Sequence, residues 1–311
     1  MKMEYCTDVK EGVFTLKEYK KGLEVVSYAG EEIYLTIPEN FEKPVVSLGK
    51  KALLSCKQVR RVSLPETIEE VGDWAFAYCD ELREIRIPAK NIRFGKGIFR
   101  ECGKLRFVTV EGKPKEAGAL LAAAVTLLDA PYLFTPQRCG DDDWLKQWDA
   151  RMLQMLRAAD REGYSKMVLC GEEDYGSREN NLDYYLNQKR RTKVRVAFMR
   201  LLNWMGLQGE VREELEDYLR AHTEGSGYAG GMSAGKDGAD IWDETWQVLL
   251  EEHGEDSEYY KLFTEIGCLT EDNFDRILSQ TGESCPEMKA WFLKYKEENI
   301  GYKDFFEDLM L

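Results

Sequence analysis

The sequence predicts an α+β protein, in which a short solenoid of parallel β coils is packed against a C-terminal all-α domain of helical hairpins. Cys56, Cys79 and Cys102 stand 23 residues apart, and the residues between them repeat with the same period. Such a period is typical of stacked coils, because no single coil can bury its apolar face alone. From Asp141 onward, apolar residues recur with the helical period of about 3.6 residues.

The repeat covers three segments, residues 45–67, 68–90 and 91–113. Six columns match in all copies: Gly49, Gly72 and Gly95 (the glycine column); Leu53, Phe76 and Phe99; the three cysteines; Val59, Leu82 and Leu105; Val62, Ile85 and Val108; and Leu64, Ile87 and Val110. Each copy ends in an alternating apolar and polar stretch, as expected of a half-buried strand. We expect the glycine column to mark a tight bend at positive φ.

The second copy reads V-G-D-W-A-F-A-Y-C from Val71 to Cys79, followed by Leu82, Ile85, Ile87 and Pro88. Residues 20–113 thereby resemble BspA-type leucine-rich repeats, whose units read I-G-x-x-A-F-x-x-C-x-x-L-x-x-I-x-I-P. Residues 22–39 resemble the N-terminal cap of that family. The resemblance implies a leucine-rich repeat solenoid, and it favours a binding role, since many relatives are cell-surface binding proteins.

A chain of 311 residues is expected to form two domains. We place a leucine-rich repeat domain with its N-terminal cap at residues 1–114 and an α-helical domain at residues 115–311. The apolar run at 117–130 is too short to span a membrane, so we expect residues 115–130 to form a helix that caps the repeats. We expect a flexible glycine-rich loop at residues 223–239.

Helical periodicity predicts a series of helices joined by short connections, as in helical hairpins. They begin near Asp141 and continue over residues 180–202, 210–222, 241–253, 258–265, 271–280, 287–297 and 303–309. Residues 259–293 weakly resemble an ankyrin-type helix pair. The tryptophans of this region are expected in the core: Trp144, Trp148, Trp204, Trp242, Trp246 and Trp291.

The formal charge of −14 is unevenly placed, with +3 on residues 1–115 and −17 on the remainder. Such a charge repels nucleic acid and anionic membranes, so we expect neither nucleic-acid binding nor membrane insertion. The first residues lack the apolar core of a secretion signal, and the cysteines fit free thiols. We therefore expect a cytoplasmic protein, or a cell-surface protein if the native start lies upstream.

The glycine-rich stretch from Gly225 to Gly238 matches several catalytic motifs, including a phosphate-binding loop and a nucleophile elbow at Ser233. These motifs need a strand before them and a helix after them, and a helix is expected before this stretch. A hydrolase using Ser233, Asp243 and His253 would place the last two about 15 Å apart on one helix. The cysteine column lacks a nearby histidine. We expect no catalytic residues, metal or cofactor.

The outward strand residues should line the concave face of the solenoid and bind a protein partner. They are Arg61, Ser63, Glu84, Arg86, Phe107 and Thr109, flanked by Arg60, Arg83 and Arg106. Arginines beside an exposed ring suit an acidic or planar partner group. Alternatively, they only keep the face soluble or contact the acidic helical domain. We expect a non-catalytic protein-interaction module of unknown partner; the alternatives are an adhesin-like surface binder and an enzyme that uses the helical domain.

Overall fold

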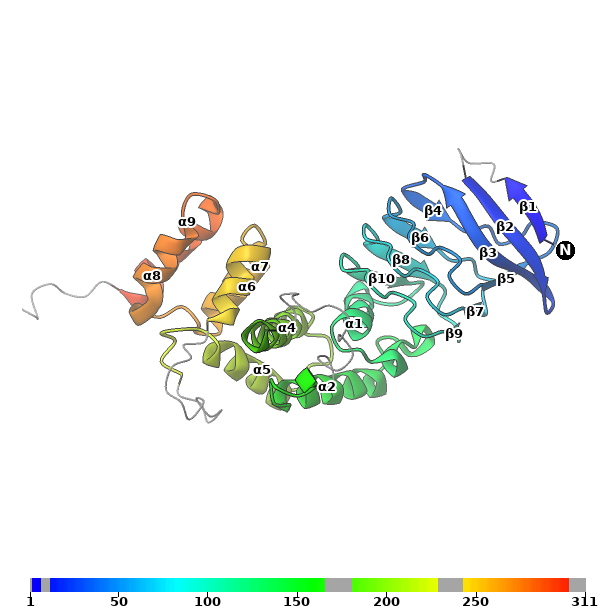
Figure 1. Ribbon diagram of the computed structural model, residues 1–311. Coiled ribbons are helices and arrows are strands. Elements are labelled where there is room, and N and C mark those ends of the chain that lie inside the picture. Colours follow the sequence, from blue (N-terminus) through cyan, green and yellow to red (C-terminus); the bar gives the residue numbers. More distant parts are fainter. Residues whose placement is uncertain (1, 7–11, 166–180, 229–242, 302–311) are drawn as a thin grey trace, which may run out of the picture. The chain divides into compact units, whose positions relative to one another are not determined.

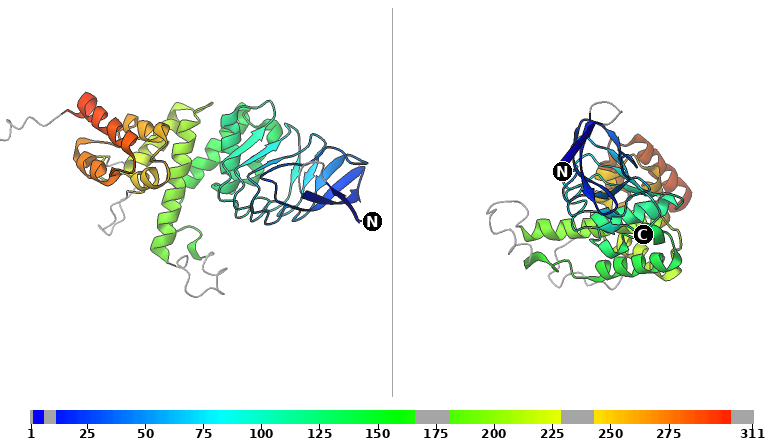
Figure 2. Two further views of the ribbon diagram at one scale, coloured as in Figure 1. Left: turned by 90° about the horizontal axis from the view of Figure 1, so that it is seen from above. Right: turned by 90° about the vertical axis from the view of Figure 1, so that its right-hand side faces the viewer.

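The computed structural model describes residues 2–6, 12–165, 181–228 and 243–301 (Figure 1 and Figure 2). The chain divides into two compact units, residues 1–152 and 153–311. The described strands all belong to the first unit, and the helices from α4 onward belong to the second. The domain boundary between residues 114 and 115 stays a prediction.

The first unit contains two sheets, in the orders β1-β2-β3-β5-β7-β9 and β10-β8-β6-β4. The strands of the six-stranded sheet are β1 (Lys2–Cys6), β2 (Gly12–Tyr19), β3 (Gly22–Gly30), β5 (Val45–Leu48), β7 (Glu70–Val71) and β9 (Arg93–Phe94). Those of the four-stranded sheet are β4 (Tyr34–Thr36), β6 (Arg61–Ser63), β8 (Glu84–Ile87) and β10 (Phe107–Val110). Strands β1 to β3 pair antiparallel, and all later pairs are parallel. Residues 23–110 thus form a β-solenoid of about four turns, followed by helices, which confirms the predicted solenoid.

The repeated apolar columns lie in register between successive coils, as the period predicted. Val62, Ile85 and Val108 pair across β6, β8 and β10, and each is at most 1% exposed. Ile87 pairs with Val110 in the same way. Burial of each such side chain contributes roughly 1.5–3 kcal/mol, so every coil depends on its neighbours for its core.

The prediction that the glycine column has positive φ is wrong. An added Cβ at Gly72 would lie 2.6 Å from the backbone N of Lys50 and 2.8 Å from the backbone C of Gly49. At Gly95 it would lie 2.4 Å from the backbone N of Asp73. The column must be glycine because the backbone of the preceding coil leaves no room for a side chain.

Positive φ instead occurs two and six residues after each glycine, with the same 23-residue period. The first set is Lys51, Trp74 and Gly97 at 62°, 62° and 58°, and the second is Ser55, Tyr78 and Glu101 at 60°, 61° and 59°. In these turns the coils remain hydrogen-bonded to one another, for example from Trp74 N to Lys96 O at 3.0 Å. Left-handed backbone at a non-glycine residue costs about 1–3 kcal/mol, which the stack must offset.

Helix α1 (Lys115–Thr126) follows β10 and lies across the end of the repeats (Figure 1). It approaches so closely that an added Cβ at Gly118 would lie 2.2 Å from Val108 O. Phe134 packs edge-on against Phe94 of β9, with ring centroids 4.4 Å apart. The last coil of the array is therefore covered on both sheets by the residues that follow it.

The remaining described helices agree with the predicted ones to within a few residues. They are α2 (Asp142–Arg157), α4 (Leu182–Leu202), α5 (Gly209–Ala221), α6 (Glu244–Glu252), α7 (Ser257–Glu265), α8 (Glu271–Thr281) and α9 (Pro286–Tyr295), with short helices η1 (Pro131–Leu133), η2 (Pro136–Arg138) and η4 (Lys296–Ile300). The helix predicted at 303–309 and most of the predicted loop at 223–239 lie outside the described residues. No described helix combines the length and apolar composition needed to cross a membrane.

Helix caps and a shared aromatic core stabilise the helices of the second unit. The side chain of Asn181 accepts hydrogen bonds at the start of α4, and Thr270 opens α8 with a capping box. Trp246 of α6 lies 5.9 Å from Phe263 of α7 and 6.1 Å from Phe292 of α9, measured between ring centroids. Three helices therefore contribute to one buried cluster.

The prediction that the tryptophans are core residues is wrong for Trp204, which is 68% exposed. Trp144, Trp148 and Trp246 are buried, Trp291 is half-buried, and Trp242 lies outside the described residues. Trp204 belongs to the turn between α4 and α5, where the fully buried Arg200 donates hydrogen bonds to Asn203 O and Met205 O. The turn is thus fixed from below by a buried guanidinium, while its tryptophan faces solvent.

Candidate functional site

The outward side chains of the four-stranded sheet form one surface, which we call the β4–β10 face. Alternation along each strand sends Val62, Ile85 and Val108 into the core and their neighbours outward. In register, the outward residues form two rows: Tyr34–Arg61–Glu84–Phe107 and Thr36–Ser63–Arg86–Thr109. The structure thus brings together all six strand residues that we expected to bind a partner, and their binding role stays a prediction.

Glu84 lies at the centre of this face and binds both arginines. Its Oε2 accepts a hydrogen bond from Arg61 Nε at 2.6 Å, and its Oε1 accepts from Arg86 Nε at 2.9 Å and from Thr109 Oγ1 at 2.8 Å. The Glu84 side chain is 17% exposed, against 37% for Arg61 and 51% for Arg86. One half-buried carboxylate therefore orients two guanidinium groups that remain open to solvent.

These contacts keep Glu84 ionised. Burial raises the pKa of its carboxyl group, but hydrogen bonds from Arg86, Thr109 and Arg61 outweigh burial, so the pKa lies below its ordinary value. Hydrogen bonds between charged groups are stronger than neutral ones. At neutral pH, two arginines and one carboxylate leave a single positive charge at the centre of the face.

Two exposed aromatic rings stand at the ends of the first row. Tyr34 is 63% exposed and Phe107 is 53% exposed, and the Arg61 Cζ atom lies 5.1 Å from the Tyr34 ring centroid. Sequence reasoning missed Tyr34, because it precedes the first recognised copy and is not 23 residues from Arg61. The alternation of exposed Tyr34, buried Leu35 and exposed Thr36 is the signal that could have found it.

Arg60, Arg83 and Arg106 precede β6, β8 and β10 and line one edge of the β4–β10 face, as their spacing implied. Arg83 N donates to Arg60 O at 2.9 Å, and Arg106 N donates to Arg83 O at 3.0 Å. All three side chains are exposed. Arg83 lies 3.8 Å from Glu81, and Arg106 donates to Gly103 O at 2.8 Å. The column adds positive charge beside the face.

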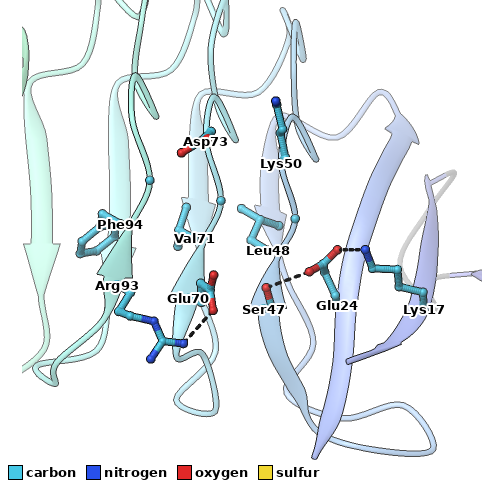
Figure 3. Close-up of a pocket in the computed structure, with 13 residues that line it drawn as sticks. Lys17, Glu24, Ser47, Leu48, Lys50, Glu70, Val71, Asp73, Arg93 and Phe94 are labelled. Atoms are coloured by element: carbon cyan, nitrogen blue, oxygen red, sulfur yellow. Dashed lines mark hydrogen bonds and ion pairs between the residues drawn. The ribbon is translucent and has the colours of Figure 1, made fainter. Parts of the chain in front are cut away.

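A groove of about 420 Å³ lies on the other sheet, along the glycine column (Figure 3). Lys17, Glu24, Ser47, Glu70 and Arg93 form an in-register row beside it, one residue from each of five neighbouring strands. Because the glycines carry no side chains, the backbone of β5, β7 and β9 is left open next to this row.

Four charged side chains of the groove form two ion pairs. Lys17 Nζ lies 2.5 Å from Glu24 Oε1, and Arg93 Nη2 donates to Glu70 Oε2 at 2.7 Å (Figure 3). Hydrogen bonds from Arg93 and then Lys20 lower the pKa of Glu70 to about 2. These pairs join successive strands, so the groove follows from coil packing: its width comes from the glycines and its charges hold the register.

The described residues of the hydrolase constellation are far apart in the fold. Asp243 and His253 lie at opposite ends of α6, as predicted. His253 stacks on Tyr259 with ring centroids 3.6 Å apart. The other members of the glycine-rich motifs, Ser233 and Lys236, lie outside the described residues.

The other histidine, His222, belongs to the core of the second unit. It is 2% exposed and stacks on Tyr218 at 4.0 Å between ring centroids. Burial lowers its pKa to about 4, so it is uncharged at neutral pH. A buried neutral imidazole packed on an aromatic ring supports the helices and is closed to a substrate.

The cysteine column links successive coils. Cys79 Sγ donates to Leu53 O and Cys102 Sγ to Phe76 O, each at 3.1 Å, and burial raises the pKa of Cys102 to about 11. Six cysteines are free thiols: Cys56, Cys79, Cys102, Cys139, Cys268 and Cys285. Over the described parts of the chain, histidine, cysteine and carboxylate side chains form no cluster suited to a metal ion.

Comparisons with known proteins give a family match in the repeat region. The family described as "BspA type Leucine rich repeat region (6 copies)" matches residues 33–120. No curated protein matches the chain. The comparisons give no support to the ankyrin-like interpretation, and the C-terminal helical region has no assigned family.

Several solved structures resemble the repeat region. A leucine-rich repeat protein of T. pallidum is 24% identical over 33% of this chain and 70% of its own, with a TM-score of 0.24. One from Bacteroides ovatus is 25% identical over 33% of this chain and 29% of its own, with a TM-score of 0.29. One from Bacteroides capillosus is 25% identical over 32% of this chain and 94% of its own, with a TM-score of 0.26.

The family match covers the same coils that the 23-residue period defined. It also covers β4, β6, β8 and β10, and therefore every strand of the candidate face. Residues 33–120 are a BspA-type leucine-rich repeat region.

Proposed function

We propose that this chain is a non-catalytic protein-interaction module and that its β4–β10 face is the binding surface. Leucine-rich repeat proteins are commonly binding modules. The observation that carries the proposal is the pair of exposed rings, Tyr34 and Phe107, at either end of a centre fixed by Glu84.

The aromatic and arginine side chains of the β4–β10 face are held in place before a partner binds. A protein interface gains most of its affinity from a few aromatic and arginine side chains held in place before binding. Tyr34 and Phe107 stand on strands of a hydrogen-bonded sheet, and Arg61 and Arg86 are held by one carboxylate. Little conformational entropy would be lost when a partner covers these four side chains.

We test the face by affinity capture from native lysate, with partners identified by mass spectrometry. The bait pair is the full-length wild type and the double variant Tyr34→Ala/Phe107→Ala. Tyr132→Ala is the matched control, because Tyr132 is 58% exposed but lies in η1, outside the face. We expect a protein retained by wild type and Tyr132→Ala but lost by the double variant. Identical captured sets for all three baits would contradict the proposal.

A cytoplasmic location is part of the same proposal. Six cysteines of the chain are free thiols, and free thiols persist in reducing compartments. The alternative is a cell-surface binder. Protease treatment of intact source cells distinguishes the two: an intracellular protein stays intact until the cells are lysed, whereas cleavage on intact cells would place it at the surface.

A further inference from the structure

We propose that the β4–β10 face binds an extended peptide segment in which one acidic side chain lies between two apolar ones, in the order apolar-x-acidic-x-apolar. This inference rests on the proposed function, namely that this face binds a protein, and it adds the chemistry of the bound segment. The groove of the other sheet carries no comparable inference, because its row of charged side chains is already paired, Lys17 with Glu24 and Arg93 with Glu70.

The β4–β10 face leaves several arginine hydrogen-bond donors open. Glu84 uses only the Nε atom of Arg61 and of Arg86. For the Nη groups of both side chains, the described part of the chain supplies no hydrogen-bond partner. A carboxylate accepts such donors in a planar arrangement, often two at a time. The two oriented guanidinium groups therefore suit one incoming carboxylate.

The β4–β10 face carries a net positive charge at its centre and along one edge. Arg61 and Arg86 against Glu84 leave one positive charge at the centre of the face. The exposed column of Arg60, Arg83 and Arg106 lies along its edge, and Arg83 of this column lies 3.8 Å from Glu81. Complementary charge guides association and excludes wrong partners, so this surface selects an acidic segment over a basic one.

The spacing of the two exposed rings suits an extended peptide. Tyr34 and Phe107 lie in one row on the outer strands of the four-stranded sheet. Three strand-to-strand steps of about 4.8 Å separate their strands by about 14 Å. An extended peptide covers this distance in about four residues, and its residues i, i+2 and i+4 face the same side. Apolar side chains at i and i+4 would then meet the rings, and the side chain at i+2 would lie over β6 and β8, which carry the arginines.

Synthetic peptides test this register by fluorescence anisotropy with the full-length protein. The probe is a fluorescein-labelled peptide with the core Phe-Thr-Glu-Thr-Phe between Gly-Ser flanks. One control replaces the glutamate with glutamine, and a second, Phe-Glu-Thr-Thr-Phe, moves the acid to the opposite side of the extended chain. We expect each control to bind at least tenfold more weakly than the probe, because neither places a charged acceptor beside the two guanidinium groups.

Protein variants locate the contact. Arg61→Gln/Arg86→Gln should lose the preference for the glutamate peptide, because the side chains that bind its carboxylate are gone. Arg93→Gln, on the other sheet, removes one arginine outside the face and should preserve the tenfold preference of the wild type. The wild-type preference should also shrink in 0.5 M NaCl, where charges at the surface are screened over about 4 Å.

Each other outcome overturns the inference in a recognisable way. Equal binding of the glutamate and glutamine peptides by the wild type, still lost in Tyr34→Ala/Phe107→Ala, would refute the acidic register and leave the face as a binding surface. No binding of any peptide by the wild type would refute an extended segment as the ligand. A dimer in sedimentation analysis that Tyr34→Ala/Phe107→Ala disrupts would refute it in favour of a second copy of the chain. Failure of the proposed function itself would appear separately, as capture unchanged by that double variant.

Discussion

Replacing Gly72 with alanine tests why the repeat needs a glycine column. An added Cβ would lie 2.6 Å from Lys50 N and 2.8 Å from Gly49 C, whereas ordinary contacts begin near 3.4 Å. The neighbouring coil would have to move by roughly 0.6–0.8 Å, which overpacks a tightly packed structure. That movement would stretch the bond from Gly72 N to Leu48 O, now 2.7 Å. Overpacking of about 1–3 kcal/mol and about 1 kcal/mol for the weakened hydrogen bond give a loss of about 3 kcal/mol.

Two further alanine substitutions separate crowding from backbone conformation. Gly97 has a φ of +58°, but its nearest neighbour to an added Cβ is 3.7 Å away, so Gly97→Ala should cost only the left-handed conformation, about 1–2 kcal/mol. Gly103 has no atom within 4 Å of an added Cβ and no positive φ. Gly103→Ala should therefore change the free energy of unfolding by less than about 0.5 kcal/mol.

Thermal unfolding and hydrogen exchange of the full chain measure these effects. A loss of 3 kcal/mol lowers Tm by roughly 6–12 °C for a unit of about 150 residues. Exchange should accelerate in peptides from residues 59–87, while peptides from α4 in the second unit provide an internal reference. If Gly72→Ala is tolerated as well as Gly103→Ala, close coil approach is the wrong explanation. If Gly97→Ala costs more than Gly72→Ala, backbone conformation dominates instead.

Two other predictions concern charge networks in the two units. The pKa of Glu70 is lowered to about 2 from 4.5, so its stabilising contribution should be complete above about pH 4.5 and should disappear as the pH falls toward 2. Glu70→Gln should therefore flatten the pH dependence of the free energy of unfolding, measured by urea titrations across this range. An unchanged slope would contradict the ion-pair network. Arg200→Met should lower the free energy of unfolding by about 3 kcal/mol, because two carbonyls of the Trp204 turn lose their buried donor. Arg212→Met, at a 45% exposed side chain on α5, is its control and should cost under about 1 kcal/mol; equal effects in chemical denaturation would show that the buried donor is unimportant.

Periodicity predicted the solenoid because stacked coils share one core. Columns such as Val62, Ile85 and Val108 are apolar in sequence for the same reason that they pair in space. The helices were predicted for a similar reason, since their apolar stripe must face a neighbour. These features depend on residues close in sequence or on a strict repeat, and one chain displays both.

The candidate face could be predicted only in part. Alternation identified Arg61, Glu84, Arg86 and Phe107 as outward residues, but not that Glu84 would bind both arginines. Tyr34 escaped because the first coil does not keep the 23-residue period. The reason for the glycine column was missed too, because the clash arises with the backbone of another coil and no local sequence pattern records that distance.

The repeat and the helical pattern of the sequence were enough to predict that residues 20–113 form stacked coils, which side chains enter their core, and where helices replace strands. Which charged side chains meet could be seen only in the tertiary structure. Arg61, Glu84 and Arg86 lie on two coils, and the distances between them depend on the strand register. The tertiary structure also placed Trp204 in solvent and Arg200 beneath it. The periodic order of apolar residues can be seen in the sequence, because it reflects which side chains are buried. The distances between polar atoms on different coils and helices are set only when those elements pack together.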